Sequence, residues 1–225
     1  EIGLAAAEES TKAIVSLLQG SDLVVVVFSA AGGTGGGGAS LFLKKAKELQ
    51  IPCIAFVIQP FEAEGPKKKI MENKGLEEAR KHADAVILID NNQIFKLATK
   101  STTFQSCLEM VSQEIFQAIK ILLLIIEQHG QVHVDFNDVL SAIREKESVV
   151  FGLGVASGTN RALNALEKAI HTPFANKTDK YLNILIYIRG NQVLAHEVEQ
   201  ILAGAFKFFS YDEQTLMKPG IIYND

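Results

Sequence analysis

The residues best suited to chemistry stand in a glycine-dense segment, Ala31-Gly32-Gly33-Thr34-Gly35-Gly36-Gly37-Gly38-Ala39-Ser40. Glycine lets the backbone approach a ligand closely and adopt left-handed conformations, so successive N–H groups can converge on an anion. The segment follows an apolar run and precedes a predicted helix from about Leu41 to Leu49, whose N-terminus adds partial positive charge. It therefore predicts a phosphate-binding turn, with a flexible surface loop as the alternative. It is neither the usual dinucleotide motif nor a Walker loop.

Two carboxylates form the second candidate. Asp135 and Asp138 lie three positions apart, close to His133 and directly after a long predicted helix. At the start of a following helix they could simply cap its N–H groups. The functional interpretation is that they act as a general base or orient a water molecule on a phosphate.

A loop carboxylate followed by lysines forms the third candidate. Glu64 precedes Lys67, Lys68 and Lys69. A carboxylate can accept hydrogen bonds from ribose hydroxyls and a lysine can reach phosphate, although three lysines at a helix start are equally consistent with a solvated face. No metal site is predicted, because neither the cysteines nor the histidines have ligand spacing: Cys53, Cys107, His82, His129, His133, His171 and His196.

The elements that must position these residues alternate in the first half of the chain. After a helix over 5–18, the apolar, partly β-branched runs predict strands over 23–28, 53–58 and 85–89, and helices over 41–49 and 67–81 separate them. Runs that are apolar on both faces are typical of covered parallel strands. The order predicts parallel crossovers and an α/β fold, a three-layer domain with a parallel sheet.

The alternation of strands and helices ends at a long helix predicted from about Phe104 to Gln128. Its second half is apolar nearly all round, which predicts burial on every side. The remainder predicts a second, smaller α/β unit, with domains at 1–129 and 130–225. Its helices are expected at 136–144, 162–170 and 195–203, and its strands at 149–156, 181–188 and 221–223.

Composition limits the class of protein. The chain has 225 residues, 48% of them hydrophobic and 21% charged, with a formal net charge of −4. This is globular composition and argues against disorder, while the slight acidity argues against a nucleic-acid binder. The longest apolar run, Ile121 to Ile126, is far shorter than the roughly 20 residues of a membrane-spanning helix. We therefore expect a soluble, intracellular protein.

The glycine segment 31–37 resembles the signature of the tubulin/FtsZ family, small-Gly-Gly-Thr-Gly-small-Gly. Five further segments resemble FtsZ motifs in the same order: Gly3 to Ser10, Pro60-Phe61-Glu62-Ala63-Glu64-Gly65, Asn91, the synergy-loop segment His133 to Val139, and the stretch Gly152 to Ala162. Short connections favour FtsZ over tubulin.

This resemblance implies a bacterial cytoskeletal GTPase of cell division that polymerises head to tail. GTP or GDP, with Mg²⁺, would be held by residues 31–37, Glu64, Lys68, Asn91 and Gln113, and Asp135 and Asp138 would be catalytic. The implied location is the cytoplasm at the division site. The implied partners are further copies of the chain and other division proteins, with no nucleic acid and only indirect membrane contact.

The family's nucleotide-proximal helix suggests how the two sites are shared. A helix of about 25 residues is roughly 37 Å long. If its first turns face the nucleotide, Asp135 and Asp138 lie too far away to act within the same molecule. They would act on a nucleotide of the adjacent subunit, a head-to-tail contact that propagates into a filament.

Several positions depart from the family pattern. Gly36 replaces a residue that is usually Ser, Ala or Thr, Lys68 replaces Arg, Leu108 and Gln113 stand where Phe and Asp contact guanine, and His133 replaces Asn. The family's first nucleotide-binding segments would precede Glu1 and its final strand would follow Asp225, so a truncated domain is expected. Two alternatives remain: a hydrolysis-deficient scaffold of division, and a monomeric α/β nucleotide enzyme.

Overall fold

The structure is a computed structural model that describes residues 2–93, 98–99, 101–127, 138–139, 141, 152–171, 183–209 and 216–223. The chain divides into two compact units. One comprises residues 1–113 and 143–150, and the other comprises 114–142 and 151–225. The division falls inside the long helix, and the domain boundary at residue 129 stays a prediction.

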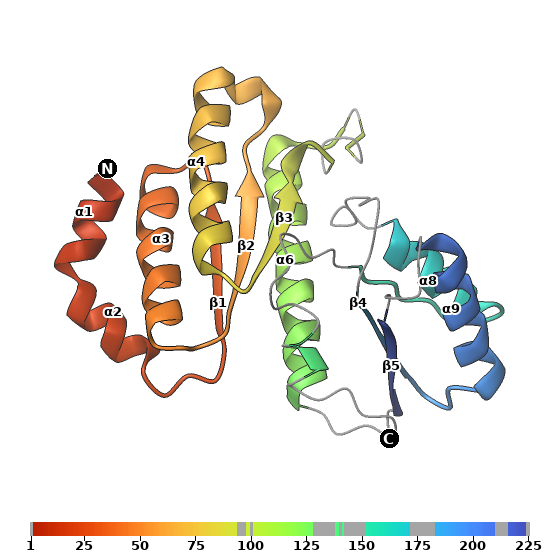
Figure 1. Cartoon of the computed structure of the whole chain (residues 1–225). Helices are drawn as coiled ribbons and strands as arrows, with labels where there is room; N and C mark the ends of the chain where they lie inside the picture. The colour runs from red at the N-terminus through yellow and green to blue at the C-terminus, as the bar shows by residue number, and fades with distance from the viewer. Residues whose placement is uncertain are drawn as a thin grey trace. The chain divides into compact units, whose positions relative to one another are not determined.

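The first unit is built on a three-stranded parallel sheet (Figure 1). Its strands are β1 (Val24–Ser29), β2 (Cys53–Gln59) and β3 (Ala85–Asp90), in the order β1-β2-β3. The three predicted strands are therefore confirmed, with small differences at their ends. The central strand β2 is buried over most of its length, as its unbroken apolar run predicts for a covered parallel strand.

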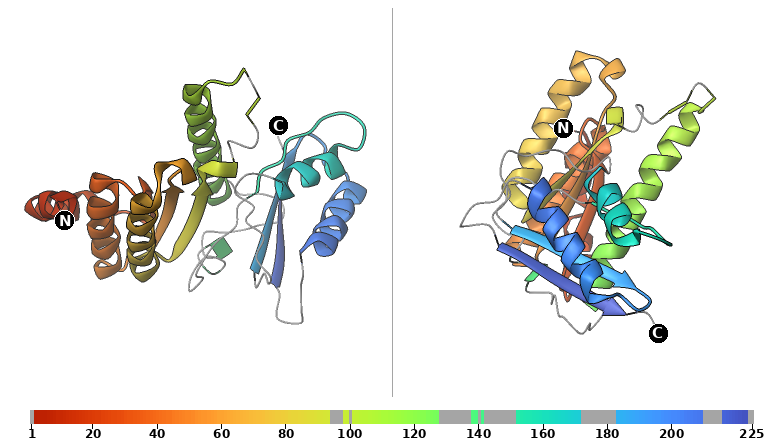
Figure 2. Two further views of the ribbon diagram at one scale, coloured as in Figure 1. Left: turned by 90° about the horizontal axis from the view of Figure 1, so that it is seen from above. Right: turned by 90° about the vertical axis from the view of Figure 1, so that its right-hand side faces the viewer.

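Helices cover both faces of this sheet. The helices α3 (Gly33–Glu48) and α4 (Pro66–His82) pack beside each other, and α6 (Phe104–Glu127) begins on the opposite side of the strands (Figure 2). The three-layer α/β fold is thereby confirmed. The core between the sheet and α3 and α4 contains Phe28, Leu41, Leu43, Ala46, Cys53, Ala55, Val57, Ala79 and Val86.

The N-terminal helical segment is two helices, and the prediction of one helix over 5–18 was wrong. The helix α1 spans Ile2–Glu9 and α2 spans Thr11–Leu18, with Ser10 between them at φ −97° and ψ 11°. The Thr11 hydroxyl donates a hydrogen bond to the Glu8 carbonyl at 2.6 Å. Local side-chain bonds of this kind to a backbone carbonyl accompany bends in helices.

The glycine-dense segment is also different from its prediction. It was expected to be a turn, with the helix beginning near Leu41, but α3 begins at Gly33. Glycine disfavours helix through its backbone entropy, by about 1 kcal/mol per residue relative to alanine. Close packing compensates here. A Cβ on Gly35 would lie 2.8 Å from the Ser29 oxygen, and one on Gly37 would lie 2.6 Å from the Leu4 nitrogen.

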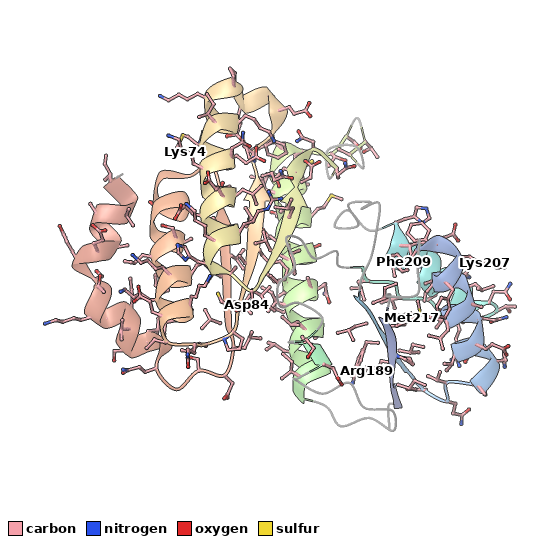
Figure 3. All side chains as sticks on the ribbon, in the orientation of Figure 1. Lys74, Asp84, Arg189, Lys207, Phe209 and Met217 are labelled. Carbon is pink, nitrogen blue, oxygen red and sulfur yellow. The ribbon has the colours of Figure 1, made fainter. Side chains whose placement is uncertain are left out.

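The starts of β2 and β3 are tied by a side chain. The Cys53 N–H donates a hydrogen bond to Asp84 Oδ2 at 2.8 Å, and Figure 3 labels Asp84 at the beginning of β3. Burial, with a smaller contribution from the Asp84 charge, raises the pKa of the Cys53 thiol to about 12. Cys53 and Cys107 are both free and buried.

The long helix α6 is present over 24 residues, close to the predicted range. Its buried positions recur at helical spacing on one face: Cys107, Val111, Ile115, Ala118 and Leu122. Phe116 and Leu123 are 63% and 43% exposed, so the expectation of burial on every side was wrong. Among the described helices, none combines the length and apolar character needed to cross a membrane.

The second unit contains the parallel pair β4 (Asn183–Gly190) and β5 (Leu216–Tyr223) with helices α8 (Arg161–Ile170) and α9 (Ala195–Phe208). Its core cluster includes Ala162, Ile188 and Ile201. The prediction at 149–156 was wrong where the structure describes it, because residues 152–156 form no strand. Of the helix predicted at 136–144, only 138, 139 and 141 are described, and these are helical.

Candidate functional site

The site lies at the carboxyl ends of β1, β2 and β3. Because the strands are parallel, the segments that follow them meet at one edge of the sheet. These segments are 30–37, 60–64 and 91–92. All three belong to the first unit.

The segment after β1 presents backbone N–H groups at the start of α3. Gly32 is the residue before the helix, in an extended conformation, and no side chain caps the helix. The first intrahelical bond runs from the Gly36 N–H to the Gly32 carbonyl at 2.9 Å. The preceding N–H groups of Gly33, Thr34 and Gly35 therefore have no acceptor within the helix. Uncapped N–H groups at a helix N-terminus are suited to bind an anion.

The helix α4 fixes the backbone that leads into these N–H groups. A Cβ on Gly75 would lie 2.7 Å from the Ala30 carbonyl oxygen, so only glycine permits this approach. One face of α4 also carries Lys68, whose ammonium donates a hydrogen bond to the Ala31 carbonyl at 3.3 Å. The structure thus brings Lys68 to the glycine segment, where it adds a positive charge beside the uncapped helix end.

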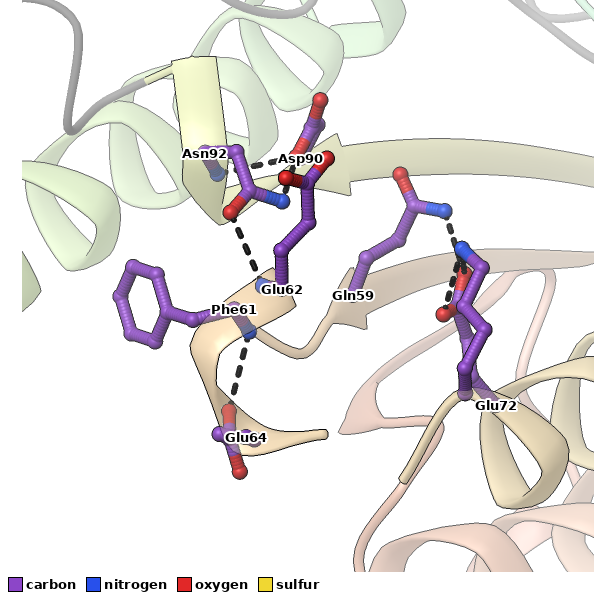
Figure 4. Close-up of polar contacts among 8 residues, drawn as sticks. Gln59, Phe61, Glu62, Glu64, Glu72, Asp90 and Asn92 are labelled. Atoms are coloured by element: carbon purple, nitrogen blue, oxygen red, sulfur yellow. Dashed lines mark hydrogen bonds and ion pairs between the residues drawn. The ribbon is translucent and has the colours of Figure 1, made fainter. Parts of the chain in front are cut away.

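Glu64 lies next to Lys68 in the loop that follows β2. Its Oε1 accepts a hydrogen bond from the Phe61 N–H at 3.0 Å (Figure 4), and its Oε2 lies 3.8 Å from Lys68 Nζ. The side chain is 39% exposed. Glu64 therefore keeps an accessible oxygen that could accept a hydrogen bond from a ligand hydroxyl.

The helical residues 91–93 after β3 hold the loop in place. The Glu62 N–H donates to Asn92 Oδ1 at 3.0 Å, and Asn92 in turn donates to Asp90 Oδ1 (Figure 4). Asn91 is 7% exposed, and its Oδ1 has no hydrogen-bond partner among the described residues. A buried amide oxygen without a partner is uncommon, and a bound ligand would explain it.

The start of α6 reaches the same loop. The Phe104 ring lies 5.6 Å from the Phe61 ring, centroid to centroid, and Phe104 is 57% exposed. Further along α6, Leu108 is 41% exposed and Gln113 is exposed. The predicted base-contacting residues are therefore accessible to a ligand.

The predicted catalytic residues are described only in part. Asp138 is half-buried and helical, whereas Asp135 and His133 lie outside the described residues. Where the structure describes the chain, no cluster of three or more His, Cys, Asp or Glu side chains could hold a metal ion.

Sequence reasoning missed Gln59, Glu72 and Asn92. Glu72 is 1% exposed and accepts hydrogen bonds from Gln59 and from Lys69 (Figure 4). One signal was present in the sequence: Lys68, Glu72 and Gly75 are spaced by four and three residues, so they share one face of a helix. Asn92 carried no such signal.

Taken together, the described groups can bind a phosphate through uncapped N–H groups and a lysine. The same edge offers a carboxylate and an unpartnered amide oxygen, which are acceptors for the hydroxyl and N–H groups of a nucleoside. This combination fits a nucleotide better than a simple anion.

Comparison with known sequences points to one family. Residues 1–99 match the model of the Tubulin/FtsZ family, GTPase domain. Cell division protein FtsZ of Coxiella burnetii is 32% identical, in an alignment that covers 100% of this chain and 58% of that protein. Cell division protein FtsZ of Rhizobium radiobacter is 33% identical over 196 residues, which cover 86% of this chain and 34% of that protein. The chain thus spans 30% to 58% of the length of such curated relatives.

Comparison with solved structures finds the same fold in members of this family. The FtsZ dimer of M. jannaschii has a TM-score of 0.88 and 25% identity, covering 100% of this chain and 65% of that chain. CetZ2 from Haloferax volcanii, solved as a GTPγS-bound protofilament, shares the fold with a TM-score of 0.79 at 21% identity, covering 100% of this chain and 70% of that chain. The resemblance to the tubulin/FtsZ family is confirmed.

Proposed function

Because this chain has the sequence signature and the fold of the tubulin/FtsZ family, we propose that it binds GTP and GDP at the carboxyl edge of β1–β3 and hydrolyses GTP within a filament of cell division. The observation that carries the proposal is the convergence of four groups from separate segments: the uncapped N–H groups of 33–35, Lys68, Glu64 and Asn91.

Each group has a defined role in this proposal. The N–H groups at the start of α3 bind the phosphates, because the helix dipole adds positive charge where they point. Lys68 adds a point charge to the same phosphates. Glu64 accepts a hydrogen bond from the ribose, and Asn91 Oδ1 accepts one from the nucleoside.

Guanine would bind near the first turns of α6. Gln113 offers an amide where relatives of this family use a carboxylate, so it can accept one N–H of guanine and donate to an acceptor. Leu108 and Phe104 provide apolar surface. We expect weaker discrimination between guanine and adenine than a carboxylate would give.

Hydrolysis is proposed to use Asp135 and Asp138 of the adjacent subunit. A helix of 24 residues is about 36 Å long. Its first residue, Phe104, contacts the loop of the nucleotide site, and the two acids follow its far end in the sequence. A head-to-tail neighbour can bring these carboxylates to a phosphate, where they would orient the attacking water. The M. jannaschii FtsZ solved as a dimer supports self-association.

The proposal includes a cation and a place in the cell. Mg²⁺ would be held by the nucleotide phosphates, and it would neutralise charge that develops during phosphoryl transfer. The natural protein would act in the cytoplasm at the division site, in contact with copies of itself and with other division proteins.

The test is the substitution Asp138→Ala in the natural protein. We expect phosphate release under assembly conditions to fall by a factor of about 10² or more, because general-base catalysis contributes that much. Binding of GTP to the unassembled protein should be unchanged. Glu199→Ala, an exposed acid on α9, is the matched control and should release phosphate normally. Normal phosphate release by Asp138→Ala would refute the catalytic assignment.

A second candidate is a scaffold that assembles without hydrolysis. It is favoured by Lys68, whose single ammonium already donates to the Ala31 carbonyl, since an arginine could bind phosphate through two parallel hydrogen bonds. Nucleotide-dependent light scattering without phosphate release would identify the scaffold. Scattering with release would identify the GTPase.

A further inference from the structure

We propose that Glu72 is a positioning residue of the nucleotide site, which sets the placement of the Glu64 loop and leaves Lys68 as the lysine that serves phosphate. This inference rests on the proposed function. It concerns a buried carboxylate on α4 that none of the motifs includes.

Glu72 is almost completely inaccessible, with a side chain that is 2% exposed. Its Oε1 accepts hydrogen bonds from Gln59 Nε2 at 2.5 Å and from Lys69 Nζ at 2.9 Å (Figure 4). Its Oε2 lies 2.8 Å from the same ammonium, but accepts no hydrogen bond among the described residues. The carboxylate thus joins the end of β2 to the second turn of α4.

This arrangement is a poor way to gain stability. A carboxylate taken out of water loses several kcal/mol of hydration, which only excellent pairing returns. Here both carboxylate oxygens share the ammonium of Lys69, which is 63% exposed, and beyond that ion pair Oε2 has no hydrogen-bond partner among the described residues. An apolar residue at this position would avoid that loss. The arrangement is better explained by the groups that it holds in place.

The first of these groups is Gln59, the last residue of β2. Two residues later the Phe61 N–H holds the carboxylate of Glu64. A fixed Gln59 side chain therefore fixes the direction in which the chain leaves the sheet. If Glu72 is removed, Gln59 loses the acceptor of its amide, and the end of β2 loses a tie to α4 ahead of the loop that presents Glu64.

The second group is the ammonium of Lys69. Glu72 holds it at 2.8 to 2.9 Å, so the ammonium of Lys69 is engaged by a carboxylate of its own helix. Lys68, by contrast, lies 3.3 Å from the Ala31 oxygen and 3.8 Å from Glu64. These are long contacts that a phosphate could replace. Glu72 thereby separates the roles of two adjacent lysines.

The experiment measures the affinity of the unassembled natural protein for a fluorescent GTP analogue together with its free energy of unfolding. We expect Glu72→Ala to weaken nucleotide binding about tenfold or more, because a small displacement of positioned groups has effects of that order. Glu72→Gln keeps an acceptor for Gln59 and should bind within about threefold of the wild type. Gln59→Leu removes the other partner without changing α4, and should weaken binding as Glu72→Ala does.

Two controls separate positioning from stability alone. Ala79→Gly, at a fully buried position of α4, should destabilise the protein by about 1 kcal/mol with unchanged nucleotide affinity. Glu77→Ala removes an exposed α4 carboxylate and should change neither quantity. If Glu72→Ala is destabilised but binds the analogue as the wild type does, the inference is wrong. It is also wrong if Glu72→Gln binds as weakly as Glu72→Ala. If the wild type itself binds no analogue, the proposed function fails, and this inference fails with it.

Discussion

The glycines at the start of α3 are not equivalent. A Cβ on Gly38 would meet no atom closer than 4.0 Å, whereas a Cβ on Gly37 would lie 2.6 Å from the Leu4 nitrogen. We expect Gly38→Ala to stabilise the protein by about 0.5–1 kcal/mol, because alanine restricts the unfolded chain and favours helix. Gly37→Ala should destabilise it by about 1–3 kcal/mol, because α1 must move away from α3.

Urea denaturation of the two variants provides the comparison. The pair is matched in chemistry, since each variant adds one methyl group to neighbouring residues of the same helix. Equal effects of the two substitutions would show that α1 does not pack against α3 as described.

A second prediction at this scale concerns acid stability of the second unit. Arg161 donates hydrogen bonds to both carboxylate oxygens of Glu197, at 2.6 and 2.9 Å. This pairing, with a further bond from the Leu194 N–H, lowers the pKa of Glu197 from 4.5 to about 2. The folded state therefore binds its proton less readily than the unfolded state. The stabilisation is complete above pH 4.5 and is lost as the pH falls toward about 2.

The variant Glu197→Gln should accordingly unfold at a lower temperature than the wild type at neutral pH, by several degrees. The difference should shrink as the pH falls through the same range. Circular dichroism melts at a series of pH values give the melting temperature of each protein as a function of pH. If the difference in melting temperature is as large at pH 3 as at neutral pH, the lowered pKa of Glu197 is wrong. Glu199 is an exposed acid on the same helix, so the melting temperature of Glu199→Ala should change with pH as that of the wild type does.

Among the elements, α4 packs directly against the backbone that leads into the glycine segment. Gly75→Ala would place a methyl carbon 2.7 Å from the Ala30 oxygen, which is backbone and cannot turn aside. We expect a loss of about 1–3 kcal/mol in the free energy of unfolding and weaker nucleotide binding, because Lys68 would move with the helix. Lys74→Ala, at the exposed neighbouring position that Figure 3 labels, should change stability by less than about 0.5 kcal/mol.

Denaturation and titration with a fluorescent nucleotide measure both quantities. Wild-type stability in Gly75→Ala would mean that the approach of α4 to the Ala30 carbonyl is looser than described.

The sequence predicts helices and strands well where one feature, such as an apolar run or a proline, marks them clearly. The strands β1 to β3 are apolar runs with clear ends, and α4 begins at Pro66, as the preference of proline for the first helical turn predicts. The prediction failed where packing overrides composition. Glycine predicts a turn at 31–40, but residues 33–40 are helix, in close contact with α1 and β1. The strand β5 begins at Leu216, five residues before the predicted start at Ile221.

For the site, the sequence identified the segments but not their connections. Glu64, Lys68 and the glycine segment were found because their residue types suit phosphate and ribose. The anchoring contact between Gln59 and Glu72 was not found, because it joins two polar residues that are 13 positions apart and lie on different elements. Only the fold shows that Glu72 is buried.

For the whole molecule, a shared active site predicts that GTP turnover depends on protein concentration. Turnover per molecule should be low below a critical concentration and rise steeply above it, because in the proposed mechanism only assembled neighbours supply Asp135 and Asp138. Phosphate release measured over a dilution series tests this. Turnover per molecule that is constant across the series would favour a monomeric enzyme.

Complementation gives a sharper test of the same idea. A Lys68→Ala subunit has a weakened nucleotide site and intact acids, and an Asp138→Ala subunit has the reverse. Each alone should release little phosphate, whereas their mixture should recover activity, because each contributes the part that the other lacks. No recovery in mixed filaments would argue against division of the site between subunits.

The burial of both native thiols has a practical consequence. Cys53 and Cys107 are 0% and 1% exposed, and the pKa of Cys53 is raised to about 12, so little reactive thiolate is available in the folded protein. A single cysteine introduced on the surface, for example at Lys74, should therefore react with a maleimide dye without first removing the native ones. Energy transfer between subunits labelled in this way could follow assembly in real time.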